Sequence, residues 1–353
     1  MKNGNNNWGF TQIWNASILE REEREITKRD RIWASELGKS LVDIYLKMKG
    51  EKPTNPPNAR SLRKFEAGNI WEWIVKLILL RAGILQSTQK WTGYQYPDLL
   101  EVSGKMDFVA GGKPDYEKGL SELKNLILPD IFLRAGKNIL NYFKENYPDG
   151  LDEKILEIKS VSAFMFDNYE SRKVASKNHR MQLFHYLKAE NKEKGEIIYV
   201  CKDDCRMLEV PVINPSPVED EYKGQIEKLT NYFKNDEQPP LEEPIVFDED
   251  FGKFAKNWHF AYSLYLTKLY GFKDQNEFDE KYLPIVEKWN RVLGRIKEEK
   301  EMTDNNKMAL EEIEKAGFDI EKIKMDIGLQ LELEDEEDRS EKLKEVNKAF
   351  GTK

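Results

Sequence analysis

The stretch ILEIKSVSAF, which spans Ile155–Phe164, alternates apolar and polar side chains over its first half. Alternation with a period of two is typical of a β-strand, because successive side chains point to opposite faces of the sheet. Glu157 and Lys159 therefore share one face of this strand, while Leu156 and Ile158 share the other. In a central strand both charged groups are partly buried, which is costly unless they are paired or bind a metal. The alternative is an edge strand that carries an ordinary ion pair.

Further strands and helices are expected on both sides of this stretch. Their positions follow from apolar spacing, from glycine and from proline. The pattern predicts strands at 99–110, 195–202 and 207–212, and helices at 17–28, 32–48, 61–81, 116–147 and 176–191. This order of helices and strands favours an α/β fold in which helices flank a mixed central β-sheet.

The chain has 353 residues, a length that suggests about two domains at roughly 150 residues each. Residues 236–250 include prolines and carry seven acidic residues and no basic ones, which is typical of a linker. We expect an N-terminal helical segment over 1–65 that packs on the core, a core over 66–235, the acidic linker over 236–250 and a helical region over 251–353.

Composition excludes several classes of protein. The chain is 39% hydrophobic and 34% charged, and no apolar stretch reaches the about 20 residues that a membrane helix needs. The opening MKNGNNNWGF contains no apolar run of a secretory signal. Cys201 and Cys205 are the only cysteines, which is too few for a disulfide framework or for the four thiolates of an iron–sulfur cluster. We therefore expect a cytoplasmic protein that has no membrane association and no iron–sulfur cluster.

Charge is unevenly distributed along the chain, although the net charge is −8. Residues 1–64 contain 13 Lys/Arg and 8 Asp/Glu, a balance of +5, and residues 153–194 contain 9 and 6, a balance of +3. A basic face could therefore meet a polyanion such as DNA. Ordinary solvated faces explain the same counts equally well.

One further carboxylate, Asp107 in the segment SGKMDF, gives Glu157 and Lys159 a chemical context. Mg²⁺ binds one or two carboxylates, keeps several waters and bridges to substrate phosphate. The bound ion lowers the pKa of a water molecule and stabilises charge on the phosphate. A lysine beside such a site offers a compact cationic donor to the transition state. This combination of residues is typical of metal-dependent phosphodiester hydrolysis.

The sequence resembles the PD-(D/E)XK nuclease superfamily, and within it the RecB-like and lambda-exonuclease-like branch. The motifs that carry the resemblance are Gly104 and Asp107 as G-x-x-D, Glu157 and Lys159 as E-I-K, Gln182 and Tyr186 as Q-x-x-x-Y, and Glu72 four residues after Gly68. The resemblance covers roughly residues 66–212. It implies a restriction-endonuclease-like core with N- and C-terminal helical extensions.

The resemblance also implies roles for individual residues. Asp107, Glu157 and Lys159 would be the catalytic residues. Glu72, Asp107, Glu157 and the backbone carbonyl of Ile158 would bind Mg²⁺ or Mn²⁺. The four-cysteine iron–sulfur cluster of some relatives is not expected here.

A basic helix follows the E-I-K strand. Gln182 and Tyr186 are one helical turn apart and share a face, where they would support the metal site or touch DNA. The basic residues expected to hold DNA phosphate are His179, Arg180, Arg172, Lys173 and Lys177. The alternative is an amphipathic helix that packs on the sheet and exposes a solvated basic face.

We therefore expect a metal-dependent deoxyribonuclease, and first of all an exonuclease in recombination, repair or phage DNA metabolism, from a bacterium or a phage. An endonuclease of the same fold is the first alternative. A non-catalytic DNA-binding or assembly protein is the second. DNA is the expected partner, and a second copy of the chain or a recombination protein is a further candidate.

Overall fold

The computed structural model describes residues 10–21, 27–125, 138–139, 141–214, 216–248, 252–297, 303–320 and 322–323. The chain forms two compact units, Met1–Pro240 and Leu241–Lys353. Parts of the expected helices at 17–28 and 116–147 lie outside the described residues. The boundary expected at residue 65 falls inside a helix, and the boundary between the units lies within the range 236–250.

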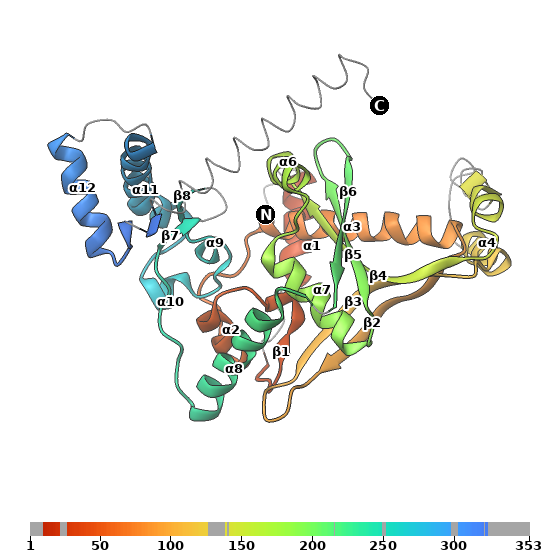
Figure 1. The fold of residues 1–353 in the computed structure, drawn as a ribbon. Helices are drawn as coiled ribbons and strands as arrows, with labels where there is room; N and C mark the ends of the chain where they lie inside the picture. Colours follow the sequence, from red (N-terminus) through yellow and green to blue (C-terminus); the bar gives the residue numbers. More distant parts are fainter. Residues whose placement is uncertain are drawn as a thin grey trace, which may run out of the picture. The chain divides into compact units, whose positions relative to one another are not determined.

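The first unit contains all the elements of the α/β fold (Figure 1). In chain order they are α1 (Phe10–Arg21), β1 (Ile32–Trp33), the 3-10 helix η1 (Ala34–Glu36), α2 (Leu41–Met48), α3 (Ala59–Arg81), β2 (Leu85–Tyr94), β3 (Val102–Gly112), α4 (Tyr116–Asn125), β4 (Leu151–Val161), α6 (Ala163–Arg172), α7 (Lys177–Ala189), β5 (Lys194–Cys201), β6 (Met207–Ile213) and α8 (Glu219–Asn235). The expected strands at 99–110, 155–164, 195–202 and 207–212 correspond to β3, β4, β5 and β6.

Within the described residues, six strands form one mixed sheet in the order β1-β3-β4-β5-β6, with β2 paired to β3. The pairs β1·β3 and β4·β5 are parallel, and β2·β3, β3·β4 and β5·β6 are antiparallel. Because β2 follows β3 along most of its length, β1 and β4 share the opposite edge of β3. The predicted α/β fold with a mixed central sheet is confirmed.

Helices cover both faces of this sheet, and the side chains of β4 and β5 alternate between two apolar clusters. Ile155 and Ile197 belong to the cluster that includes residues of α2, α7 and α8. Leu156, Ile158 and Ile198 belong to the cluster formed with α3. The sheet is therefore buried on both sides, and β4 is a central strand rather than an edge strand.

Two parts of the first unit differ from the sequence-based expectation. Ile32–Glu36, expected as the start of a helix, forms β1 and η1, because Ile32 pairs with Val102 of β3 and is fully buried. Strand β2 was not expected, because its sequence LQSTQKWTGY is largely polar and its side chains are exposed or half-buried.

The second unit contains β7 (Ile245–Asp248), β8 (Lys253–Lys256), α9 (His259–Tyr262), α10 (Leu266–Tyr270), α11 (Gln275–Lys297) and α12 (Asp304–Lys315). The β7–β8 hairpin is antiparallel, and Ile245 and Phe254 pack on α11 and α12 through Trp289 and Ile313. The range expected as an acidic linker therefore includes a strand, and the region expected to be helical includes another.

No helix in the described part of the chain is both long enough and apolar enough to span a bilayer.

Candidate active site

Four elements of the first unit bring the candidate residues together. Helix α3 carries Glu72, β3 carries Asp107, β4 carries Glu157 and Lys159, and α7 carries Gln182 and Tyr186. These side chains are connected by hydrogen bonds or by direct electrostatic interaction, as described below. The residues of all four sequence motifs therefore form one cluster.

Asp107 lies where β3 and β4 separate. Strand β4 pairs with β3 from Phe108 onward, and β1 pairs with it at Val102–Ser103, so Gly104–Asp107 lies between the two pairings. The backbone N–H of Ile158 donates to Asp107 Oδ2 at 2.9 Å. This bond holds the carboxylate beside β4, and the Asp107 side chain is 8% exposed.

Glu157, Lys159 and Gln182 form a closed triangle of hydrogen bonds. Lys159 Nζ donates to Glu157 Oε1 at 2.5 Å and to Gln182 Oε1 at 3.1 Å. Gln182 Nε2 donates to the same Glu157 oxygen at 2.7 Å. The second carboxylate oxygen, Glu157 Oε2, is buried and has no hydrogen-bond partner among the described residues. An unsatisfied buried carboxylate oxygen is costly, and it is available to a ligand.

Tyr186 supports this triangle from one helical turn away. Gln182 Nε2 lies 3.1 Å from Tyr186 Oη, and the Tyr186 hydroxyl donates to the carbonyl of Lys105 at 3.2 Å. Tyr186 is 1% exposed, so its side chain does not face solvent. It was expected either to pack on the sheet or to touch DNA, and its burial favours packing.

Glu72 reaches the cluster through a residue that sequence analysis did not identify. Gln89 Nε2 lies 3.5 Å from Glu72 Oε2 and 3.4 Å from Asp107 Oδ1. Gln89 has a φ of 52°, which is uncommon for a residue other than glycine. Since β2 was not predicted, the sequence offered no signal that Gln89 lies opposite Asp107.

Burial and mutual repulsion raise the pKa of each carboxyl group in the cluster. Burial and then the Asp107 charge raise the pKa of Glu72 to about 7 and that of Glu157 to about 8. Burial also raises the pKa of Asp107, against the attraction of Lys159. Burial alone would lower the pKa of Lys159, but the charges of Glu157, Asp107 and Glu72 raise it, so the ammonium form is favoured. Ionisation of all three carboxyl groups at once is therefore unfavourable in this cluster, even with the Lys159 ammonium beside them.

The cluster contains oxygen donors of the kind that a hard divalent cation prefers. Asp107 and Glu157 supply carboxylate oxygens, one of which has no partner, and Mg²⁺ needs only one or two protein carboxylates. Within the described residues, no group of three His, Cys, Asp or Glu side chains is arranged to hold a metal ion as it stands. The Gln89 amide lies between Glu72 and Asp107, and the Lys159 ammonium is bonded to Glu157.

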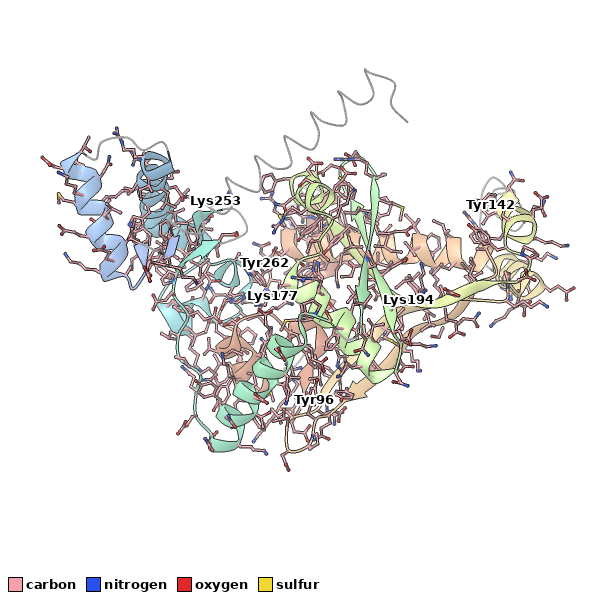
Figure 2. The ribbon with its side chains drawn as sticks, viewed as in Figure 1. Tyr96, Tyr142, Lys177, Lys194, Lys253 and Tyr262 are labelled. Carbon is pink, nitrogen blue, oxygen red and sulfur yellow. The ribbon has the colours of Figure 1, made fainter. Side chains whose placement is uncertain are left out.

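The basic residues predicted to bind DNA differ from one another in burial and in their partners. His179 is part of the cluster's surroundings, where its Nδ1 lies 2.8 Å from Tyr199 Oη, and burial and the charges of Lys159 and Lys39 hold its pKa well below the usual range. Arg180 is half-buried on α7. Arg172 and Lys173 are exposed at the end of α6, and Lys177 (Figure 2) forms an ion pair with Glu221 at 2.7 Å.

Lys39, in the loop between η1 and α2, is a further cation close to the cluster. Its charge acts on Lys159 and His179, and burial, with the charge of Lys47, lowers its pKa to about 8. A lysine held near Lys159 adds positive charge on the side of the cluster formed by α7. Cys201 is buried and Cys205 is exposed, and both are free thiols.

The chain matches no family model, and it matches no curated protein. Similar solved structures include SSO0001, with a TM-score of 0.42 and 13% identity over 73% of this chain and 94% of that chain. They also include an alkaline exonuclease (LHK-Exo) from Laribacter hongkongensis, with a TM-score of 0.35 and 9% identity over 64% of this chain and 93% of that chain. The same exonuclease in complex with dAMP gives a TM-score of 0.33 and 11% identity over 64% of this chain and 91% of that chain. The proposals below therefore depend on this chain's own geometry.

Proposed function

We propose that this protein is a metal-dependent deoxyribonuclease of PD-(D/E)XK type. The observation that carries the proposal is the arrangement of Asp107, Glu157 and Lys159 at the point where β3 and β4 separate. A carboxylate pair and a lysine ammonium lie together there, and one buried carboxylate oxygen has no partner among the described residues.

Asp107 and Glu157, with the backbone carbonyl of Ile158, are the groups that would hold Mg²⁺ or Mn²⁺. Glu72 is the third candidate ligand, and the Gln89 amide connects it to Asp107. When bound, such an ion supplies Lewis-acid polarisation of the phosphate and lowers the pKa of a water molecule.

The protein's own residues contribute positioning and charge. Lys159 would place an ammonium beside the scissile phosphate and stabilise the charge that develops on its oxygens. Glu157 and Gln182 hold that ammonium in place through the triangle of hydrogen bonds. Tyr186 in turn fixes the Gln182 amide, so α7 acts as a rigid support for the reacting groups.

The test is a time course with Mg²⁺ or Mn²⁺ on end-labelled linear DNA and, in parallel, on a covalently closed circle. We expect the linear DNA to be degraded, and we expect EDTA to stop the reaction. Lys159→Ala and Glu157→Gln should each lower the rate at least about 100-fold, because each removes a group that acts on the reacting phosphate or its metal.

Lys154→Ala is the matched control, since Lys154 lies on the same strand and pairs with Glu196 away from the cluster. It should cleave at the wild-type rate. Cleavage by Lys159→Ala at the wild-type rate would contradict the proposed site. Binding of DNA without cleavage by the wild type would instead favour a non-catalytic binding protein.

The same gel separates the two nuclease activities. We propose exonuclease action first, because of the resemblance described under Sequence analysis, with endonuclease action as the alternative. Stepwise loss of the linear DNA with an intact circle would support the exonuclease. Cutting of the circle would establish the endonuclease.

A further inference from the structure

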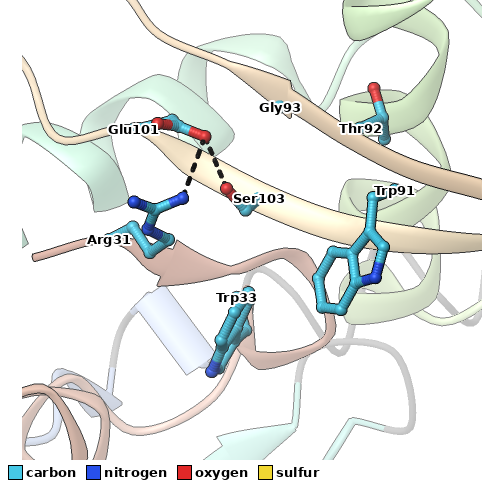
Figure 3. A pocket seen from close by; sticks show the side chains of 7 residues that line it. All are labelled: Arg31, Trp33, Trp91, Thr92, Gly93, Glu101 and Ser103. Atoms are coloured by element: carbon cyan, nitrogen blue, oxygen red, sulfur yellow. Dashed lines mark hydrogen bonds and ion pairs between the residues drawn. The ribbon is translucent and has the colours of Figure 1, made fainter. Parts of the chain in front are cut away.

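A pocket of about 430 Å³ opens on the sheet at β1, β2 and β3 (Figure 3). Trp33 and Trp91 form one wall, and Arg31, Glu101 and Ser103 form another part of the lining. Trp91 is 61% exposed. Because Trp33 adjoins it, the two rings together form an exposed aromatic surface.

The arrangement of the two indole rings leaves room for a stacked ligand on an outer ring face and not between the rings. Their centroids are 5.5 Å apart and their planes are inclined by 46°. A flat ligand inserted between parallel rings would need about two stacking distances, roughly 6.8 Å. The gap is too narrow for that, so the exposed face of Trp91 is the surface on which a planar group would stack.

The charges in the pocket favour an uncharged planar ligand over a phosphate group. Glu101 accepts a hydrogen bond from Ser103 Oγ at 2.5 Å and lies 3.8 Å from Arg31 Nη1. The Arg31 guanidinium is thus already balanced by a carboxylate, which would repel a phosphate. The Arg29 guanidinium lies over the Trp33 ring, 5.0 Å from its centroid.

The pocket and the carboxylate cluster lie on the same strand. Trp33 pairs with Ser103, Trp91 pairs with Lys105, and Asp107 is two residues further along β3. At about 3.3 Å per residue, Asp107 lies roughly 7 Å along β3 from Lys105, which pairs with Trp91, and roughly 13 Å from Ser103. These distances correspond to about two to four stacked nucleotides, so one DNA strand could reach both.

We propose that Trp91, supported by Trp33, is a stacking subsite for an unpaired base of the DNA strand whose phosphate lies at Asp107 and Glu157. An unpaired base is required because the faces of paired bases inside a duplex are covered by their neighbours. The subsite thus selects single-stranded or frayed DNA, and this inference rests on the proposed nuclease function for the identity of its ligand.

The experiment measures binding of a fluorescently labelled 12-nucleotide oligothymidylate in EDTA, so that its result does not depend on cleavage. A 12-unit abasic strand, with the same phosphates and no bases, is the second probe. We expect Trp91→Ala to weaken oligothymidylate binding about 5- to 100-fold. Trp91→Phe, which keeps an aromatic face, should stay within about threefold of the wild type.

Trp258→Ala is the matched control, because Trp258 is also exposed but lies in the second unit. It should bind as the wild type does. The abasic strand should bind the wild type and Trp91→Ala equally. Equal oligothymidylate affinity of the wild type and Trp91→Ala would overturn the subsite, as would an equal loss for the abasic strand.

The two proposals fail separately. A Trp91-dependent preference for bases in a protein that cleaves no DNA would uphold the subsite and reject the nuclease. DNA cleavage that requires Lys159, together with oligothymidylate binding that does not depend on Trp91, would uphold the nuclease and reject the subsite. Far-UV circular dichroism of Trp91→Ala confirms that the variant is folded before either result is used.

Discussion

The tightest steric constraint beside the cluster is at Gly104, the first residue of the G-x-x-D motif. A Cβ at this position would lie 2.7 Å from Ala34 Cβ and 2.7 Å from Tyr186 Cε1. Glycine is therefore needed because α7 and η1 approach the backbone of β3 closely, and this approach brings the Tyr186 hydroxyl to the Lys105 carbonyl. The motif has a packing reason as well as a chemical one.

Gly104→Ala should lower the free energy of unfolding by about 1–3 kcal/mol, because the added methyl group forces α7 away from the sheet. Urea denaturation followed by circular dichroism measures it. Gly224→Ala on α8 is the control, since a Cβ there meets nothing within 4 Å, and it should raise stability by up to about 1 kcal/mol. An unchanged free energy of unfolding in Gly104→Ala would show that the sheet and α7 accommodate the methyl group without loss of stability.

His185 makes stability depend on pH. It is fully buried, its Nδ1 lies 3.0 Å from Tyr222 Oη, and burial lowers its pKa to about 3. In the unfolded chain it titrates near its ordinary value of 6.5. The unfolded state alone therefore gains a proton as the pH falls below that value, so the contribution of neutral His185 is complete above it and is lost toward low pH.

Between pH 7.5 and pH 5.5 the wild type should therefore lose about 1 kcal/mol more unfolding free energy than His185→Gln. Glutamine keeps a polar partner for Tyr222 and does not ionise in this range. Urea titrations of both proteins at the two pH values give the difference. Parallel losses in the two proteins would mean that His185 is protonated in the folded state.

At the scale of elements, α8 holds the loop that carries Lys39. Gln225 Oε1 accepts from the N–H of Gly38 at 2.8 Å, and Gln225 Nε2 donates to the Lys39 carbonyl at 3.1 Å. The Gln225 side chain thus satisfies one backbone donor and one backbone acceptor in the loop between η1 and α2. The position of the Lys39 ammonium near Lys159 depends on a helix that lies far away in the sequence.

Gln225→Ala should lower the unfolding free energy by about 1–2 kcal/mol, through loss of two hydrogen bonds to the backbone. Hydrogen exchange of residues 37–40 should become faster, since the loop loses its clamp. Lys228→Ala, an exposed change on the same helix, should alter stability by less than about 0.5 kcal/mol. Unaltered exchange in Gln225→Ala would show that the loop is held by its other contacts.

The elements that the sequence predicted correctly are those whose local pattern and tertiary role agree. Strand β4 alternates because it is buried between two helical layers, and α7 carries its motif residues on one face. Strand β2 could not be predicted, since it lies at the edge of β3 and its side chains are largely polar and are exposed or half-buried. Ile32 was expected to begin a helix over 32–48, but its pairing with β3 places it in a strand.

In the candidate site, too, local sequence identified residues but not their tertiary contacts. Each motif residue was predicted from its own segment, whereas their meeting depends on the β3–β4 register and on the position of α7. Gln89 could not be found from sequence, because its role depends on an unusual backbone angle and on the pairing of β2. The Trp33–Trp91 pair likewise joins two strands of which neither was expected.

At the scale of the molecule, the first unit holds every residue of the cluster together with two apolar clusters of its own. The second unit has a separate core that includes Trp289, Val292 and Ile313. Each unit thus has the apolar interior that independent folding needs.

A chain that ends at Pro240 should therefore fold with a single cooperative transition and keep the carboxylate cluster. Circular dichroism with urea, and the cleavage assay described above, test both statements. Full-length protein treated in the same way is the control. A fragment without a cooperative transition would show that the first unit depends on the second for its stability.

The cluster draws on α3, β2, β3, β4 and α7, which together run from Ala59 to Ala189. Helix α7 is the last of these elements to be synthesised. A growing chain on the ribosome therefore has no complete cluster until α7 has emerged and docked on the sheet. If the protein cuts DNA as proposed, its activity begins only with a folded first unit, and a truncated translation product that stops before α7 is harmless.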